Sequence, residues 1–219
     1  MSDLHFASPA IDRCENTDAT PWERPRDEAV QAYEPFTHWA RLVDWLPRLG
    51  VVLWSCPDRS DGAFPRARIL DCGVLLFDHP ALSAFVHCTR VIAHAEVGSC
   101  GPREWLALSD AQGACLARMH LLPDTDYLAW DGMIAACALA RVAGFSRRYP
   151  WRDPGCDSAV GIAWRTTFAR FPSLRLPCLQ LLGLRRPTSV SVLGAQVAAL
   201  IARDEVADLD DFAVMLSRI

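Results

Sequence analysis

The sequence contains no lysine, so all 22 of its basic residues are arginine. The acidic residues number 26, which gives a formal net charge of −4 and no basic excess. This balance argues against non-specific nucleic-acid binding, because that activity needs a basic field. It also means that every side-chain cation other than histidine is a planar guanidinium, which can bind a carboxylate through two hydrogen bonds.

Several common motifs are missing as well. The nine cysteines include no CxxC pair, which argues against a zinc ribbon or a thioredoxin-like site. There is no GxGxxG, no Walker A and no HExxH pattern. The cysteine count is odd, and residues 1–35 lack the apolar segment of a secretory signal. We therefore expect reduced thiols and a cytoplasmic protein.

Long hydrophobic runs are also absent. The most apolar stretch, residues 127–145, is interrupted by Asp131 and Arg141, so we expect a buried helix there and no membrane span. Hydrophobic residues nevertheless make up 51% of the 219 residues. A chain of this length and composition can bury a core without disulfides or metals.

The patterns that are present predict an α+β fold, in which an antiparallel sheet over about residues 51–122 is flanked by helices. Short apolar runs between turn residues predict the strands, and the last two form a hairpin around Asp110–Gly113. The expected strands are 51–54, 74–77, 85–95, 105–109 and 114–122. Periodicity near 3.6 residues predicts the helices. They are expected at 27–49, after a cap at Asp124 or Thr125, at 188–202 and at 209–216.

The chain is expected to consist of a flexible N-terminal arm, residues 1–26, and a single domain, residues 27–219. Within this domain, we expect a helical C-terminal extension after residue 140. The pattern of residues 158–186 is ambiguous, and a helix over 164–171 is one interpretation of it. The acidic cluster at 204–211 fits a solvated, helix-capping loop better than a calcium site. A calcium loop of the EF-hand type would need a central glycine and a terminal glutamate.

The stretch Trp105–Ile134 has the pattern of a hairpin followed by a helix, and it resembles a signature of the HemS/ChuS/ChuX-like haem-utilisation family. The positions that match in type, without a gap, are Asp110, Gly113, Leu121, Asp126, Ala129 and Trp130. Residues 46–51 resemble the family's LLPxLGxV opening, and Phe85 and Arg90 fall where the family has a phenylalanine and an arginine. The resemblance spans residues 46–134 and corresponds to a single half-length copy. It implies a HemS/ChuX-like fold.

The chain departs from that signature at one important point. The family's His-Lys-x-Tyr segment is replaced by Ala117-Arg118-Met119-His120. The segment after residue 140 has no counterpart in the family pattern. The departure leaves open whether haem binding is retained.

The strand pattern brings candidate haem-binding residues together. Alternate residues of a strand share a face, so Arg118 and His120 should project with Leu116, and Arg90 should project with His94. Haem needs an apolar floor, cations for its propionates and an axial imidazole, and these residues would supply all three. The alternative is that they form the wet face of a half-exposed sheet.

Among the histidines, His120 is the first candidate for the axial iron ligand, ahead of His94 and His38. His120 stands where the family has its tyrosine, and both groups can ligate ferric iron. His38 lies on the first predicted helix, where the resemblance also allows a ligand.

The resemblance implies a cytoplasmic haem-binding protein that serves haem uptake or trafficking in iron acquisition. One alternative is an enzyme that cleaves haem oxidatively to release iron. Another is a divergent relative that has lost haem and acts through protein contacts. Haem is the expected ligand, and haem-uptake or haem-degrading proteins and a second copy of the chain are candidate partners. Nucleic acid and a membrane span are not expected.

Overall fold

The computed structural model describes residues 35–58, 66–98, 101–144, 163–205 and 207–209. All of these belong to one unit, residues 34–219. The predicted arm, 1–26, lies outside the described residues, and the domain boundary at residue 27 stays a prediction. None of the described helices is long and apolar enough to cross a membrane.

The described residues form eleven strands, four α-helices and two 3-10 helices. The strands are β1 (Val52–Pro57), β2 (Ala67–Leu70), β3 (Gly73–Phe77), β4 (Arg90–Gly98), β5 (Gly101–Ser109), β6 (Cys115–His120), β7 (Arg141–Gly144), β8 (Trp164–Ala169), β9 (Ser173–Arg175), β10 (Leu179–Leu182) and β11 (Asp208–Leu209). The helices are α1 (Trp39–Trp45), η1 (Leu46–Arg48), η2 (Pro80–Ser83), α2 (Ala84–His87), α3 (Tyr127–Ala136) and α4 (Val192–Asp204).

Two sheets organise these elements. The larger sheet has seven strands in the order β11-β8-β1-β6-β5-β4-β7, and the smaller has four in the order β2-β3-β10-β9. The central strands β8, β1, β6, β5 and β4 pair antiparallel, whereas β7 and β11 join the edges in parallel. The predicted α+β class and the antiparallel pairing of the central strands are therefore confirmed. The prediction of a single sheet over residues 51–122 is wrong, because strand 74–77 is β3 of the smaller sheet, where it pairs parallel with β10.

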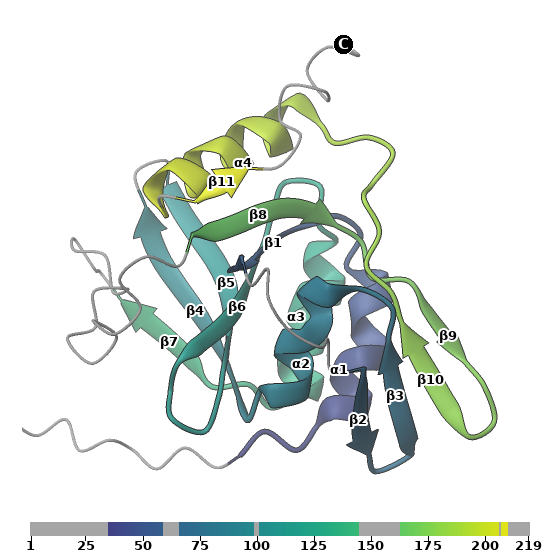
Figure 1. The fold of residues 1–219 in the computed structure, drawn as a ribbon. Coiled ribbons are helices and arrows are strands. Elements are labelled where there is room, and N and C mark those ends of the chain that lie inside the picture. The colour runs from purple at the N-terminus through teal and green to yellow at the C-terminus, as the bar shows by residue number, and fades with distance from the viewer. Residues whose placement is uncertain (1–34, 59–65, 99–100, 145–162, 206, 210–219) are drawn as a thin grey trace, which may run out of the picture. The chain divides into compact units, whose positions relative to one another are not determined.

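The seven-stranded sheet packs against helices on both faces (Figure 1). On one face, Trp54, Leu106 and Met119 join the main hydrophobic core with side chains of α1, α2 and α3; we call this the core face. On the opposite face, Leu53 and Phe168 pack against alanine and isoleucine side chains of α4. Alternation along each strand separates the two sets.

The hairpin was predicted closely. Its strands β5 and β6 flank a turn in which the Asp110 carboxylate accepts hydrogen bonds from the backbone N–H groups of Gln112 and Ala114, both at 2.9 Å. Gly113 has φ +86°, which a glycine adopts without strain. Helix α3 follows the hairpin, but its cap is Asp126, whose carboxylate accepts from the Ala129 N–H at 2.9 Å.

Two predicted elements were assigned to the wrong class. Strand 85–95 begins only at Arg90, because a helical turn that starts at Pro80 continues through His87 as α2. The segment 164–171 is not a helix but strand β8, which pairs with β1 along Val52–Pro57. Its Thr166, Thr167 and Phe168 favour an extended backbone, a preference that our helical assignment overlooked.

Helix boundaries also differ. The predicted helix 27–49 begins, in the described residues, at Trp39, and it becomes a 3-10 turn at Leu46, next to Pro47. Helix 188–202 is α4, shifted toward the C-terminus. The predicted last helix, 209–216, is contradicted where it is described, because Leu209 belongs to strand β11; its remainder lies outside the described residues.

Candidate functional site

The register of the central strands places the four predicted strand residues on one face. His94 pairs with Trp105, and Trp105 pairs with His120, so the three residues lie side by side across β4, β5 and β6. Arg90 shares the alternation of His94, and Arg118 shares that of His120. Paired residues of neighbouring strands project to the same side. The predicted common face is confirmed, and we call it the arginine–histidine face.

A β-bulge changes which residue of β6 projects beside Arg118 on this face. The register between β5 and β6 shifts next to Ser109, which pairs with Cys115 and leaves Leu116 as an extra residue. Leu116 joins the main core, so the prediction that it projects beside Arg118 is wrong. Cys115 takes that place, within hydrogen-bonding reach of the Arg118 side chain.

Aromatic rings form the apolar part of the face. The His94 imidazole stacks on Trp105 with ring centroids 4.1 Å apart and an interplanar angle of 9°. The His120 ring lies on the other side of Trp105, at 5.9 Å. The Arg118 guanidinium lies 5.5 Å from the Trp105 ring and 4.6 Å from Trp164. These cation–π contacts hold the guanidinium against a largely apolar wall.

The C-terminal end of α4 brings two carboxylates onto the same face. The Glu205 Oε1 atom lies 3.1 Å from His120 Nε2 and 3.4 Å from Arg118 Nη1. The Glu205 side chain is 2% exposed, and those of Arg118 and His120 are 8% and 5% exposed. Next to this group, the Arg103 Nη2 atom donates to Asp204 Oδ2 at 2.6 Å. In this arrangement, α4 covers Arg118 and His120.

The electrostatic consequences are clear for two of these groups. Burial alone would raise the pKa of Glu205, but His120 and Arg118 outweigh it and lower this pKa to about 2. Burial, followed by the positive charge of Arg118, lowers the pKa of His94 to about 4. Glu205 is thus ionised at neutral pH, and His94 carries a neutral imidazole, the form that ligates metals.

The carboxylates of α4 were missed by the sequence reasoning. Asp204 and Glu205 were expected in a solvated acidic loop, but Glu205 is buried and Asp204 is mostly buried. Two acidic residues at a helix C-terminus oppose the helix dipole, and this is the signal that a buried cationic partner was needed. The identity of that partner is not readable from the sequence, because 85 positions separate Glu205 from His120.

His38 lies apart from the other candidates. It is the N-cap residue of α1, and its ring lies 6.2 Å from Phe36, which in turn contacts the core residue Trp39. Because α1 packs on the core face, the sheet separates His38 from His94 and His120. These histidines therefore cannot contribute to one site together.

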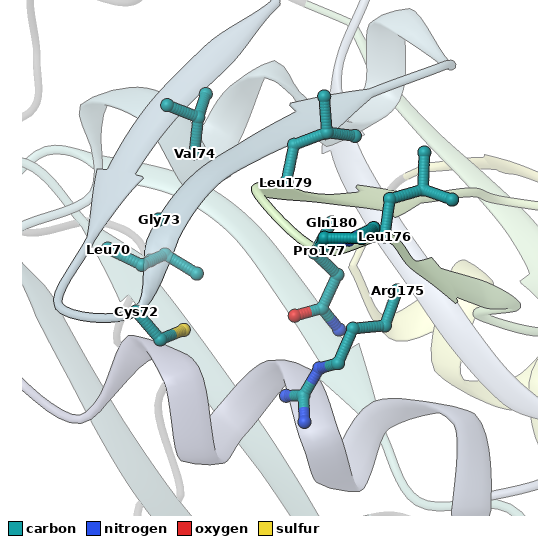
Figure 2. A pocket seen from close by; sticks show the side chains of 9 residues that line it. All are labelled: Leu70, Cys72, Gly73, Val74, Arg175, Leu176, Pro177, Leu179 and Gln180. Atoms are coloured by element: carbon teal, nitrogen blue, oxygen red, sulfur yellow. The ribbon is translucent and has the colours of Figure 1, made fainter.

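A small cavity of ≈180 Å³ lies elsewhere, at the end of the four-stranded sheet where the β2–β3 and β9–β10 turns meet (Figure 2). Figure 2 shows the Gln180 carboxamide, the Arg175 guanidinium and the Cys72 thiol on the same side of this sheet. The Gln180 Oε1 atom is buried and has no hydrogen-bond partner among the described residues. The guanidinium of Arg175 binds Asp44 at 2.6 Å. None of the predicted site residues lines this cavity.

Metal binding by protein groups alone finds no support in the described part of the chain. Across those residues, no three histidine, cysteine, aspartate or glutamate side chains are grouped so that they could hold an ion. A single axial imidazole is a different requirement, because the porphyrin supplies the other ligands of haem iron.

Comparisons with known proteins give distant similarities. No protein-family model and no curated protein matches the chain. Among solved structures, the haem-binding protein PhuS from Pseudomonas aeruginosa, in its holo form, is 19% identical over 53% of this chain, with a TM-score of 0.33. The haem-degrading enzyme ChuS from Escherichia coli O157:H7 is 16% identical over 49%, with a TM-score of 0.30. The match covers 37% of each of these two proteins.

Proposed function

We propose that this protein binds haem on the arginine–histidine face and serves haem trafficking in the cytoplasm. The observation that carries the proposal is the placement of Arg90, His94, Arg118 and His120 on one side of the sheet, around the Trp105 ring. With α4 in place, Arg90 would bind a propionate, an imidazole would ligate the iron, and Trp105 would hold that imidazole by stacking. Arg118 would bind a propionate only after Glu205 leaves it.

The individual residues fit haem to different degrees. His94 fits the role of ligand, because its imidazole is neutral, half-buried and held in place by stacking on Trp105. His120 fits only if Glu205 moves, because the carboxylate lies 3.1 Å from the Nε2 atom that would face the iron. We therefore propose His94 as the ligand while α4 is in place. His120 becomes a ligand when the end of α4 leaves.

A second candidate function rests on a specific observation. Glu205 already forms ion pairs with Arg118 and His120, an arrangement expected of a relative that has replaced a ligand by its own side chain. Such a protein would act through protein contacts. The proposal of haem degradation instead needs a reductant and an open site for oxygen.

The test is a haemin titration followed by absorbance, with apo-myoglobin as the competing acceptor. We expect one haemin per chain, and we expect His94→Ala to bind at least about tenfold more weakly, equivalent to about 1.4 kcal/mol. His87→Ala is the matched control, because His87 is exposed at the end of α2, away from this face. Equal affinities of the two variants would eliminate His94, and no stoichiometric binding would favour the protein-contact function. Loss of the Soret band on adding a reductant would identify degradation.

A further inference from the structure

Helix α4 is attached to the sheet in two different ways along its length. Its first three turns present Ala195, Ala198 and Ile201, which pack against Leu53 and Phe168 in an apolar cluster. This contact is non-directional and is not weakened by competing charges. The beginning of α4 is thus held to the sheet by apolar packing.

The end of α4 is attached by charge. Asp204 binds Arg103, and Glu205 contacts Arg118 and His120. The last residue of α4 in the apolar cluster is Ile201, and the next described residue that packs against this cluster is Leu209 of β11. Both carboxylates lie at the negative end of the helix dipole, where acidic side chains are disfavoured. The side chains of this last turn are therefore held by ion pairs, for which another carboxylate can compete.

The two arginines resemble a receptor for a ligand with two carboxylates. Arg103 and Arg118 come from the adjacent strands β5 and β6, and each holds one carboxylate from consecutive residues of α4. Guanidiniums held in such positions bind any carboxylate of suitable spacing. Asp204 and Glu205 occupy these positions in the described arrangement.

We infer that the last turn of α4, Arg203–Glu205, is a displaceable internal cover whose two carboxylates occupy the positions that the carboxylates of a porphyrin ligand take on Arg103 and Arg118. Displacement exposes His120 and extends the haem-binding surface from β4 across β6. Among the described residues, the short strand β11 that follows the cover pairs with β8 through Asp208 and Leu209, and Leu209 also packs against the apolar cluster. Strand β11 can stay on the sheet while the last turn of α4 moves. This inference rests on the proposed haem-binding function.

The cover is tested with charge-neutral variants of nearly unchanged shape. Glu205→Gln and Asp204→Asn should bind haemin about tenfold more tightly than the wild type, within the usual range of coupling between two ligands. Asp44→Asn is the matched control, because it breaks a 2.6 Å ion pair with Arg175 and changes the net charge equally at another place. Haemin dimethyl ester, which lacks both propionate charges, should not discriminate between Glu205→Gln and the wild type.

Amide hydrogen exchange of the wild type gives an independent test that needs no variant. The Glu205 N–H donates to the Ile201 carbonyl, and the Ala207 N–H donates to the Ala202 carbonyl, both at 2.9 Å. Haemin should accelerate exchange at these two amides and leave the amides of the first three turns of α4 protected. Haemin dimethyl ester should have a smaller effect.

The outcomes separate the cover from the proposed function. Haemin binding with equal affinity in wild type and Glu205→Gln, together with unchanged or slower exchange at Glu205 and Ala207, would overturn the cover and leave haem binding intact. Tight binding by Glu205→Gln with none by the wild type would support the cover and would overturn ligation by His94 in the wild type. Absence of haemin binding in every variant would overturn both.

Discussion

The two faces of the seven-stranded sheet are built from the same strands but are stabilised by different forces. On the core face, Trp54 is fully buried and stacks on Phe85 at 5.4 Å within a continuous apolar core. On the arginine–histidine face, the equally buried positions hold Arg118, His120 and Glu205. The first face depends on area removed from water, whereas the second combines an apolar contact with α4 and a group of buried charges.

The difference distinguishes the face that stabilises the fold from the face that carries the proposed site. Buried ion pairs contribute less to stability than apolar packing of the same volume, because each charge loses its hydration. Retaining them under α4 is therefore hard to explain by stability alone. This contrast is the physical reason for placing the function on the arginine–histidine face.

The largest expected effect is on the core face. Trp54→Ala should lower the free energy of unfolding by about 3–5 kcal/mol, because it removes a fully buried indole and leaves a cavity between Phe85 and Phe171. Urea unfolding monitored by circular dichroism measures the loss. A loss under about 1 kcal/mol would mean that this core is not packed as described.

On the opposite face, Arg118→Met should cost about 2–3 kcal/mol, because it leaves the Glu205 carboxylate buried with one partner fewer. The double replacement Arg118→Met with Glu205→Met should recover most of this loss. Urea unfolding of the two singles and the double gives the coupling energy. If the effects of the two singles simply add, the ion pair is not formed in solution.

The pH dependence of stability should come from the arginine–histidine face. Glu205 has a folded-state pKa of about 2, below its ordinary value of 4.5, so its contribution is complete above about pH 4.5 and is lost as the pH falls toward 2. His94 has a folded-state pKa of about 4 against 6.5, so the unfolded chain takes up its proton first, and stability falls between pH 6.5 and 4.

Single variants show which residue causes the loss of stability in each of these two pH ranges. His94→Gln should flatten the stability profile between pH 6.5 and 4, and Glu205→Gln should flatten it below pH 4.5. Thermal unfolding across this range is the measurement. An unaltered profile in His94→Gln would show that its imidazole titrates normally in the folded protein.

The smallest effect is expected for an exposed ion pair. Asp44→Asn breaks the ion pair with Arg175, in which the Asp44 side chain is 46% exposed and that of Arg175 is 61% exposed. It should change the free energy of unfolding by less than about 0.5 kcal/mol. Urea unfolding at low and moderate salt measures it. A loss comparable to that of Arg118→Met would remove the distinction between buried and exposed pairs.

Local patterns in the sequence were sufficient for the hairpin and for the common face of Arg90, His94, Arg118 and His120. Turn chemistry at Asp110–Gly113 determines the register, and the register determines the face. The same local reasoning missed the bulge at Leu116, which has no strong sequence signal. It also assigned Phe85–His87 to a strand, because β-branched and aromatic residues occur in both classes.

The cover on the site could not be predicted, for a different reason. The contact of Glu205 with His120 depends on how α4 packs against β1 and β8, and β8 had been assigned to a helix. An acidic cluster at a helix end is usually solvated. Only the three-dimensional arrangement shows that two of its carboxylates lie on arginines.

A crystal structure of the protein with bound haemin tests the central claim most directly. The account predicts the porphyrin against the arginine–histidine face, with iron ligated by His94 or His120, a propionate on Arg118, and Glu205 withdrawn from that arginine. Haemin bound instead on the core-face side next to His38, or in the cavity beside Gln180, would contradict it.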